Sequence, residues 1–186
     1  MTNESQTRAA VIAALAEKYP NENFGRTAVM KLCYFLQTLR RVPLGYHFTL
    51  YSYGPFDSDV LSDLDYAEEL GAISSVEVHY PSGAYGYRIS PTTETGALKD
   101  KAAPFLREHK ADLDWVIGEF GNMGSAELEL ASTIVYADRE VVRRGSRQTM
   151  AELVRRVSDV KPHFTQAQIE RTAGQFSEKD LLLSLA

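Results

Sequence analysis

The sequence predicts a mainly α-helical protein with a small β element. Apolar residues recur at helical spacing in both halves of the chain. Two short stretches instead alternate and are rich in aromatic and β-branched residues, which is typical of strands. The order is helix, helix, strand, helix and hairpin, which is close to that of a winged-helix unit. We therefore expect a winged-helix-like unit over residues 1–100 and a helical part over residues 101–186, packed together as one compact domain.

Three helices are predicted in the first part, over residues 5–18, 26–40 and 58–70. Each range carries apolar residues three and four positions apart, so each helix has one face that can be buried. The first range stops before Pro20, which cannot continue a helix, and the third stops before Gly71, which suits a helix C-terminus.

An aromatic stretch, Tyr46–Tyr53, is predicted to be extended, and Gly54-Pro55 ends it. Asp57 or Ser58 then caps the third helix. Because side chains alternate along a strand, only one face of this stretch can join the core, and the other face exposes tyrosines.

A hairpin is predicted at about residues 76–89, with Pro81-Ser82-Gly83 as its turn. The rest of the chain is predicted to be helical. One helix begins at Pro104 and runs to Phe120. The N-terminal signals of the later helices are Ser125, Thr149 with Glu152, Thr165 with Gln168, and Ser177 before a last short helix.

Composition excludes several classes of protein. The chain has 186 residues, 44% of them apolar and 24% charged, which is ordinary for a globular protein. Its single cysteine, Cys33, excludes an internal disulfide and a cysteine-rich zinc site. No apolar run is long enough to span a bilayer, and the polar N-terminus lacks the apolar region of a signal peptide. We expect a soluble cytoplasmic protein that needs no cofactor or metal.

The third helix argues against DNA recognition in the winged-helix manner. In that fold the helix before the hairpin enters the major groove, where basic side chains meet phosphates. This helix and its cap contain no Lys or Arg. Their acidic residues are Asp57, Asp59, Asp63, Asp65, Glu68 and Glu69. The sequence therefore favours a protein partner for this surface, or a solvated acidic face.

A basic cluster between residues 139 and 161 keeps a second possibility open. It consists of Arg139, Arg143, Arg144, Arg147, Arg155, Arg156 and Lys161. Such a cluster can contact phosphates, as in a transcriptional regulator that binds DNA, or it can face solvent or another protein surface.

Signatures of enzymes are missing from the sequence. It contains no phosphate-binding glycine loop, no nucleophile elbow and no HExxH motif. Cys33 lies on the apolar stripe of the second helix, where a small buried hydrophobic residue is expected rather than a nucleophile. We predict that the protein is not an enzyme and has no catalytic residues; an active site assembled only in the fold is an alternative that the sequence leaves open.

Two segments resemble a known family. The run Lys31-Leu32-Cys33-Tyr34-Phe35-Leu36-Gln37 resembles the K-L-x-Y-x-x-Q helix of Panacea-domain proteins, which include the SocA-like antitoxins, and of related YwgA-like bacterial proteins. Tyr51-Ser52-Tyr53-Gly54-Pro55-Phe56 is similar to the aromatic strand of that family, which ends in Y-G-P. The likeness covers about residues 7–135 and is carried by residues 26–73.

The resemblance implies a mainly helical cytoplasmic bacterial or phage protein that binds a toxin and neutralises it or presents it to a protease. We therefore expect a non-enzymatic interaction module, antitoxin-like or an adaptor; the sequence does not define its oligomeric state, and a homodimer is one option. The residues expected to bind the partner are Tyr51, Tyr53, Gly54, Pro55, Phe56, Asp59, Asp63, Lys31 and Tyr34. The alternative is a winged-helix regulator that binds DNA through Arg139, Arg143, Arg144, Arg147, Arg155 and Arg156.

Overall fold

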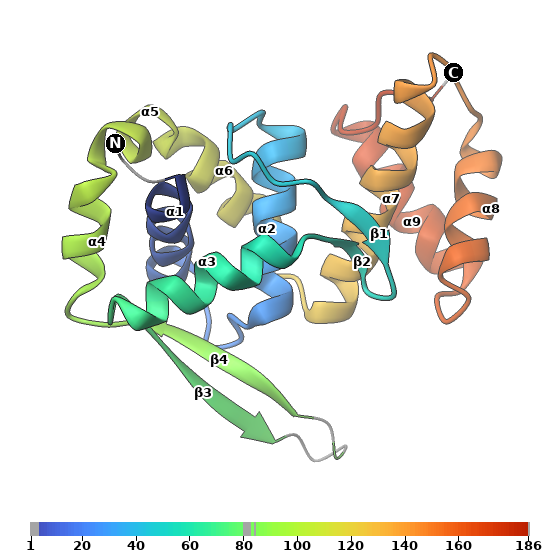
Figure 1. Cartoon of the computed structure of the whole chain (residues 1–186). Helices are drawn as coiled ribbons and strands as arrows, with labels where there is room; N and C mark the ends of the chain where they lie inside the picture. Colours follow the sequence, from blue (N-terminus) through green and yellow to red (C-terminus); the bar gives the residue numbers. More distant parts are fainter. Residues whose placement is uncertain (1–3, 80–82, 84, 186) are drawn as a thin grey trace. The chain divides into compact units, whose positions relative to one another are not determined.

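The computed structural model describes residues 4–79, 83 and 85–185. It is mainly helical with two small antiparallel hairpins, which confirms the predicted fold class (Figure 1). The helices are α1 (Glu4–Lys18), α2 (Arg26–Leu39), α3 (Ser58–Glu69), α4 (Thr95–Lys101), α5 (Ala103–Glu108), α6 (Lys110–Phe120), α7 (Ser125–Arg143), α8 (Met150–Val160) and α9 (Gln166–Glu178). The strands are β1 (Thr49–Tyr51), β2 (Gly54–Phe56), β3 (Ile73–His79) and β4 (Tyr85–Pro91).

The chain forms two compact units. Unit 1 comprises residues 1–48 and 57–125, and unit 2 comprises residues 49–56 and 126–186. The division differs from the predicted one in two ways. The main boundary lies at residue 125 instead of residue 100, and the short hairpin of residues 49–56 belongs with the C-terminal helices.

Unit 1 is built around α1 and α2. Residues 9–16 of α1 are all buried, so this helix runs through the core instead of lying on the surface. In α2 the predicted apolar stripe is buried, and Cys33 is buried with it, as expected. Phe35 of α2 stacks on Phe120 of α6, with ring centroids 3.9 Å apart. The core of this unit therefore rests on apolar contacts between helices.

The hairpin of unit 1, β3–β4, follows α3 as predicted and extends beyond the helices (Figure 1). Its base is in the core, where Ile73 and Ile89 are buried, and the Ile89 amide donates to the Phe24 carbonyl at 2.7 Å. The predicted turn residues Pro81 and Ser82 lie outside the described residues. The element order matches that of a winged-helix unit, and the likeness to that fold stays a prediction.

The C-terminal end of unit 2 differs from the predicted last helix. Ser177 lies inside α9, and the chain after it is irregular instead of helical. Asp138, which is fully buried, accepts hydrogen bonds from the Leu183 and Ser184 amides at 3.0 and 2.9 Å. The Gln148 amide donates to the Ser184 carbonyl at 2.9 Å. Backbone groups of this segment are satisfied by side chains and by a strand-like contact, so the segment needs no helix.

Two further predictions require correction. The helix expected from Pro104 to Phe120 is divided at His109, whose backbone caps both α5 and α6. The predicted single strand Tyr46–Tyr53 is instead the lead-in to a tight hairpin, because the chain reverses at Ser52 and Tyr53. By contrast, the two predicted capping boxes are confirmed at the starts of α8 and α9.

Candidate protein-interaction surface

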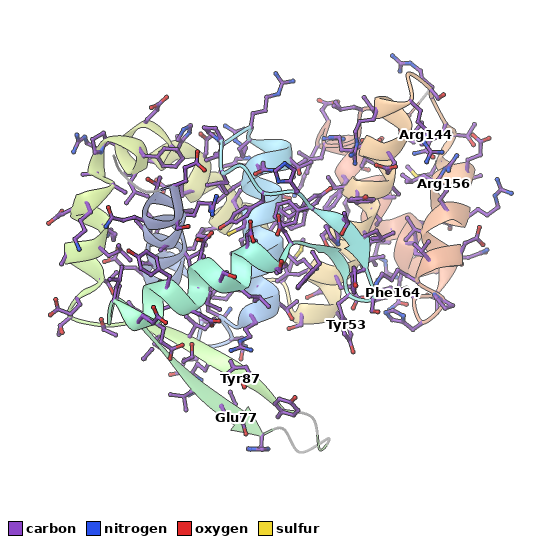
Figure 2. All side chains as sticks on the ribbon, in the orientation of Figure 1. Tyr53, Glu77, Tyr87, Arg144, Arg156 and Phe164 are labelled. Atoms are coloured by element: carbon purple, nitrogen blue, oxygen red, sulfur yellow. The ribbon has the colours of Figure 1, made fainter. Side chains whose placement is uncertain are left out.

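The hairpin of unit 2, residues 49–56, is called the tyrosine hairpin below. Tyr51 pairs with Gly54, so Ser52 and Tyr53 form a two-residue turn. Tyr51 and Tyr53 are 67% and 74% exposed, and they are among the most exposed large side chains described. The Tyr53 side chain extends outward from the turn (Figure 2). The prediction that this stretch exposes tyrosines is therefore confirmed.

Glycine at position 54 makes this turn possible. Its φ is 89°, in the region that side chains with a Cβ rarely adopt. On the strands, the ring of Tyr51 packs against the half-buried ring of Phe56, with centroids 5.6 Å apart. The Y-G-P motif thus has a local structural role, because it closes the turn and sets the positions of the two tyrosines.

A buried lysine holds the turn in place. Lys161 follows α8, and only 1% of it is exposed. Its Nζ donates to the Ser52 carbonyl oxygen, and the Tyr51 carbonyl oxygen lies 3.4 Å from it. An ammonium group offers three donors, so one lysine can bind two carbonyls of a turn and a carboxylate together.

The carboxylate is that of Glu129 on α7, of which 7% is exposed. Its Oε1 lies 2.8 Å from Lys161 Nζ and 3.3 Å from Nε2 of the exposed His163. Within the described residues Glu129 Oε1 accepts no hydrogen bond, so the contact is an ion pair, and the nearby opposite charge offsets part of the cost of burying each group. The pair therefore anchors the tyrosine hairpin to α7 and to the segment after α8.

Three residues expected at the partner surface are instead buried in unit 1. Lys31 and Tyr34 belong to the buried face of α2, and Tyr34 packs edge-on against Phe48 with ring centroids 5.1 Å apart. Asp63 is buried on α3, where it pairs with Arg8 at 2.5 Å. These three residues cannot touch a partner in this conformation, so they are structural positions.

The remaining predicted residues are divided between surface and interior. Asp59 is exposed on α3, while Phe56 is half-buried. Gly54 and Pro55 are buried, so they shape the turn and do not offer side chains to a partner. The tyrosine hairpin therefore presents mainly Tyr51 and Tyr53.

Gln37, the last residue of the K-L-x-Y-x-x-Q run, also has a structural role. Its amide nitrogen donates to the Tyr46 carbonyl at 2.8 Å, and its amide oxygen accepts from the Tyr46 amide at 2.9 Å. This double hydrogen bond imitates a strand neighbour and holds the chain extended as it approaches the tyrosine hairpin. The Tyr46 hydroxyl in turn donates to Asp63 at 3.0 Å.

Burial raises the pKa of two groups that lie near Asp63, the Cys33 thiol and the Tyr46 hydroxyl. Burial raises the pKa of the Cys33 thiol, and the nearby Asp63 carboxylate raises it further. Burial also raises the pKa of the Tyr46 hydroxyl, which donates to Asp63. A thiol that stays protonated is a poor nucleophile, in agreement with the structural role expected of Cys33.

Most of the basic cluster is engaged within unit 2. Arg139 pairs with Asp138 and donates to the Leu181 carbonyl at 3.0 Å. Arg143 and Arg144 both lie near Glu140, at 2.5 and 3.6 Å. Arg147 donates to the Leu185 carbonyl at 3.0 Å, and Arg156 donates to Gln148 at 3.2 Å. Arg144 lies just after the end of α7, whereas Arg156 lies on α8 (Figure 2).

The charge of the two units differs. Unit 2 contains nine acidic and nine basic side chains, so the formal net charge of −5 belongs entirely to unit 1. The arginines of unit 2 are therefore balanced within their own unit. Unit 2 therefore carries no net positive charge, whereas nucleic-acid-binding domains are typically basic overall.

Sequence reasoning missed two features. Lys161 was assigned to the basic cluster, although it is the buried anchor of the tyrosine hairpin, and no local pattern distinguishes it. The second feature is a pair of exposed side chains on the other hairpin, Val76 at 61% and Tyr85 at 66%. Alternation of Val76 with buried Ile73 could have revealed the first, whereas Tyr85 lies on the same face as buried Ile89, so alternation does not predict its exposure.

Neither a metal cluster nor a membrane span is found in the described part of the chain. No three His, Cys, Asp or Glu side chains there are grouped as metal ligands. Every helix over residues 4–79, 83 and 85–185 is too short or too polar to cross a bilayer.

Comparisons with known proteins add no family. No family model matches the chain, and no curated protein matches it significantly.

Proposed function

We propose that the protein is a non-enzymatic interaction module of the cytoplasm, antitoxin-like or an adaptor, which binds a partner protein through the tyrosine hairpin. One observation carries the proposal. Two tyrosines, 67% and 74% exposed, stand on a two-residue turn whose carbonyls are held by a buried lysine. Large exposed aromatic side chains on a fixed backbone are typical of binding surfaces.

Tyrosine side chains reduce the entropic cost of binding. Tyrosine offers a large contact area with only two rotatable side-chain bonds, so little freedom is lost when a partner covers it. The Lys161 anchor restricts the backbone of the turn before any partner arrives. Binding therefore loses less entropy than it would with a flexible loop.

Charge supports a basic partner. Unit 1 carries the whole net charge of −5, and Asp59, Asp65 and Glu69 of α3 are exposed. A negative surface raises the association rate of a positively charged protein. A toxin that acts on nucleic acid would have such a charge, and the resemblance to Panacea-domain antitoxins favours this class of partner.

The test compares two exposed tyrosines on different hairpins. The tagged full-length protein is purified at low salt from its own host as wild type, Tyr53→Ala and Tyr85→Ala, and native mass spectrometry measures stoichiometric complexes. We expect a partner with wild type and Tyr85→Ala, and at least about tenfold less with Tyr53→Ala, because hot-spot residues cost 2 kcal/mol or more when truncated. Thermal unfolding provides the control.

Two results would contradict the proposal. Equal loss of partner from both variants would show that the tyrosine hairpin has no special role. A loss of melting temperature in Tyr53→Ala that parallels the loss of binding would assign Tyr53 to the fold instead of to an interface.

The DNA-binding alternative has weaker support, because five of its six arginines have polar partners within unit 2. Its experimental signature is nucleic acid that co-purifies at low salt and is released as salt rises. Ultraviolet absorbance of the same preparations measures it. An Arg143→Glu/Arg144→Glu variant that retains nucleic acid at the same salt concentration would exclude this cluster as the nucleic-acid-binding surface.

A further inference from the structure

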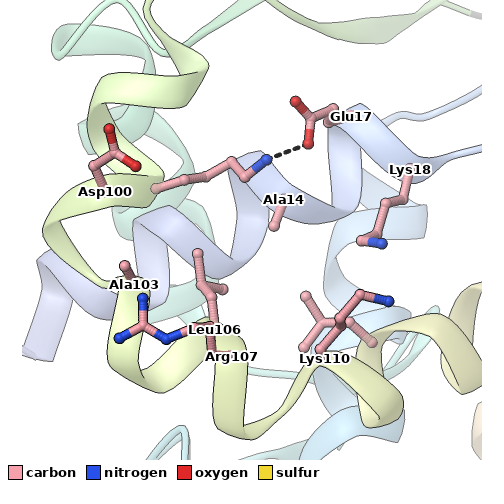
Figure 3. A pocket seen from close by; sticks show the side chains of 10 residues that line it. Ala14, Glu17, Lys18, Asp100, Ala103, Leu106, Arg107 and Lys110 are labelled. Carbon is pink, nitrogen blue, oxygen red and sulfur yellow. Dashed lines mark hydrogen bonds and ion pairs between the residues drawn. The ribbon is translucent and has the colours of Figure 1, made fainter.

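A cavity of about 290 Å³ opens among α1, α4, α5 and α6 of unit 1 (Figure 3). Its apolar lining includes Ala14, Leu106 and Leu113. The volume is at the lower end of the range of small-molecule pockets, about 300–1,000 Å³. The cavity can therefore hold only a small organic molecule.

The lining of this cavity is unusually basic for its unit. Unit 1 has eleven basic and sixteen acidic side chains, yet four basic side chains and only two acidic ones line the cavity. The basic residues are Lys18, Lys99, Arg107 and Lys110. Because these basic residues line a cavity in a unit that is negative overall, the cavity favours anionic ligands over cationic ones.

Three of these cations are already paired. Lys99 pairs with Glu17, as Figure 3 shows. Lys18 and Lys110 share Asp114, each at 2.6 Å. Within the described part of the chain, Arg107 has no ion pair and is exposed. The Arg107 guanidinium is therefore available to bind an anionic ligand.

The geometry points to a small monocarboxylate with an apolar chain or ring as the ligand of this cavity. The apolar lining contacts the hydrocarbon part of the ligand. The planar guanidinium of Arg107 donates two parallel hydrogen bonds to the carboxylate. A doubly charged phosphate fits less well, because Glu17 and Asp100 also line the cavity and would repel it.

Octanoate is a suitable probe, and 1-octanol is its neutral match. Titrations of the full-length protein are followed by ¹⁵N–¹H NMR. For a ligand of this size we expect a dissociation constant on the order of 1 mM. The shifted signals should belong to residues of α1, α4, α5 and α6, and octanol should bind at least about fivefold more weakly, since it lacks the charge.

Arg107→Gln tests the assigned cation, and Arg88→Gln is its matched control on β4 of the same unit. We expect Arg107→Gln to weaken octanoate binding about fivefold or more and Arg88→Gln to leave it unchanged. Equal binding of octanol and octanoate, or an equal effect of the two variants, would overturn the inference. Absence of saturation up to about 10 mM octanoate would overturn it as well.

Discussion

The two hairpins of this protein are both antiparallel and both expose tyrosine, but different parts of the chain hold them. The β3–β4 hairpin pairs seven residues on each strand, and its base is fixed by neighbours within unit 1. The tyrosine hairpin pairs only three residues on each strand. A two-stranded hairpin that short is not stable alone, so it depends on Lys161, 108 positions beyond Tyr53.

The difference shows how a short hairpin can be held in place without long strands. The longer hairpin has more strand pairing, and its outer part extends beyond the helices of unit 1 (Figure 1). The shorter hairpin is anchored at its turn, the part that also presents Tyr51 and Tyr53. Anchoring at the turn, rather than strand length, is the property that suits the tyrosine hairpin to binding.

The largest effect is expected from Lys161→Met. The change leaves Glu129 buried without its closest cation and should lower the free energy of unfolding by about 3–5 kcal/mol. Chemical denaturation measures the loss, and NMR should show disorder in the tyrosine hairpin with β3–β4 unchanged. The double variant Lys161→Met/Glu129→Leu should recover most of the stability, since no buried charge remains. A single variant as stable as wild type would show that the pair does not anchor the hairpin.

Alkaline pH should weaken unit 1 selectively. Burial raises the pKa of Cys33 from its ordinary value of 9.0, so the folded thiol stays protonated while the unfolded thiol ionises. The stabilisation is present below pH 9 and is lost progressively as pH rises above it, by at most about 1.4 kcal/mol for each pH unit. Unfolding of Cys33→Ala across this range should show a smaller dependence. An unchanged slope would indicate that this thiol does not contribute.

Gly25→Ala should disturb β3–β4 and leave the tyrosine hairpin intact. An added Cβ at position 25 would lie 2.6 Å from the Tyr87 carbonyl oxygen, so the strand or the start of α2 must shift. Such overpacking costs about 1–3 kcal/mol. Amide hydrogen exchange should accelerate in β4. Gly118→Ala, at a helical position with open space around it, is the matched control and should not show this change.

The smallest effect is expected from Gly54→Ala. A φ of 89° is strained for alanine, at a cost of about 1–2 kcal/mol, and the strain falls on the turn itself. We expect reduced protection of the tyrosine hairpin in hydrogen exchange and weaker partner binding, with β3–β4 unaffected. Partner affinity equal to that of wild type would mean that binding does not depend on the geometry of the turn.

Features that depend on residues close together in the sequence could be predicted. Helix starts at Thr149 and Thr165 follow from capping boxes, and the burial of Cys33 follows from the apolar stripe of α2. Errors arise where distant contacts decide. The segment after α9 has helical spacing, but Asp138 on another helix satisfies its backbone and holds it irregular.

The candidate site shows the same limit. The exposure of Tyr51 and Tyr53 was predicted from alternation along a single strand, although Tyr53 is in fact exposed because it lies in the turn. The burial of Lys31 was not predicted, because a lysine next to an apolar stripe is usually expected to reach solvent. The role of Lys161 was not predictable either, since its partners Ser52 and Glu129 are far from it in the sequence.

The membership of residues 49–56 in unit 2 has a consequence for dissection of the protein. The chain passes from one unit to the other after residues 48, 56 and 125, so no single cut yields two complete units. A fragment of residues 126–186 would lack its hairpin, and a fragment of residues 1–125 would carry a hairpin without its anchor. Fragment complementation, in which a peptide of residues 49–56 is added back to the C-terminal fragment, becomes a natural assay of this assembly. During folding, unit 2 is completed only when residues 49–56 meet Lys161, which lies more than 100 positions further along the chain.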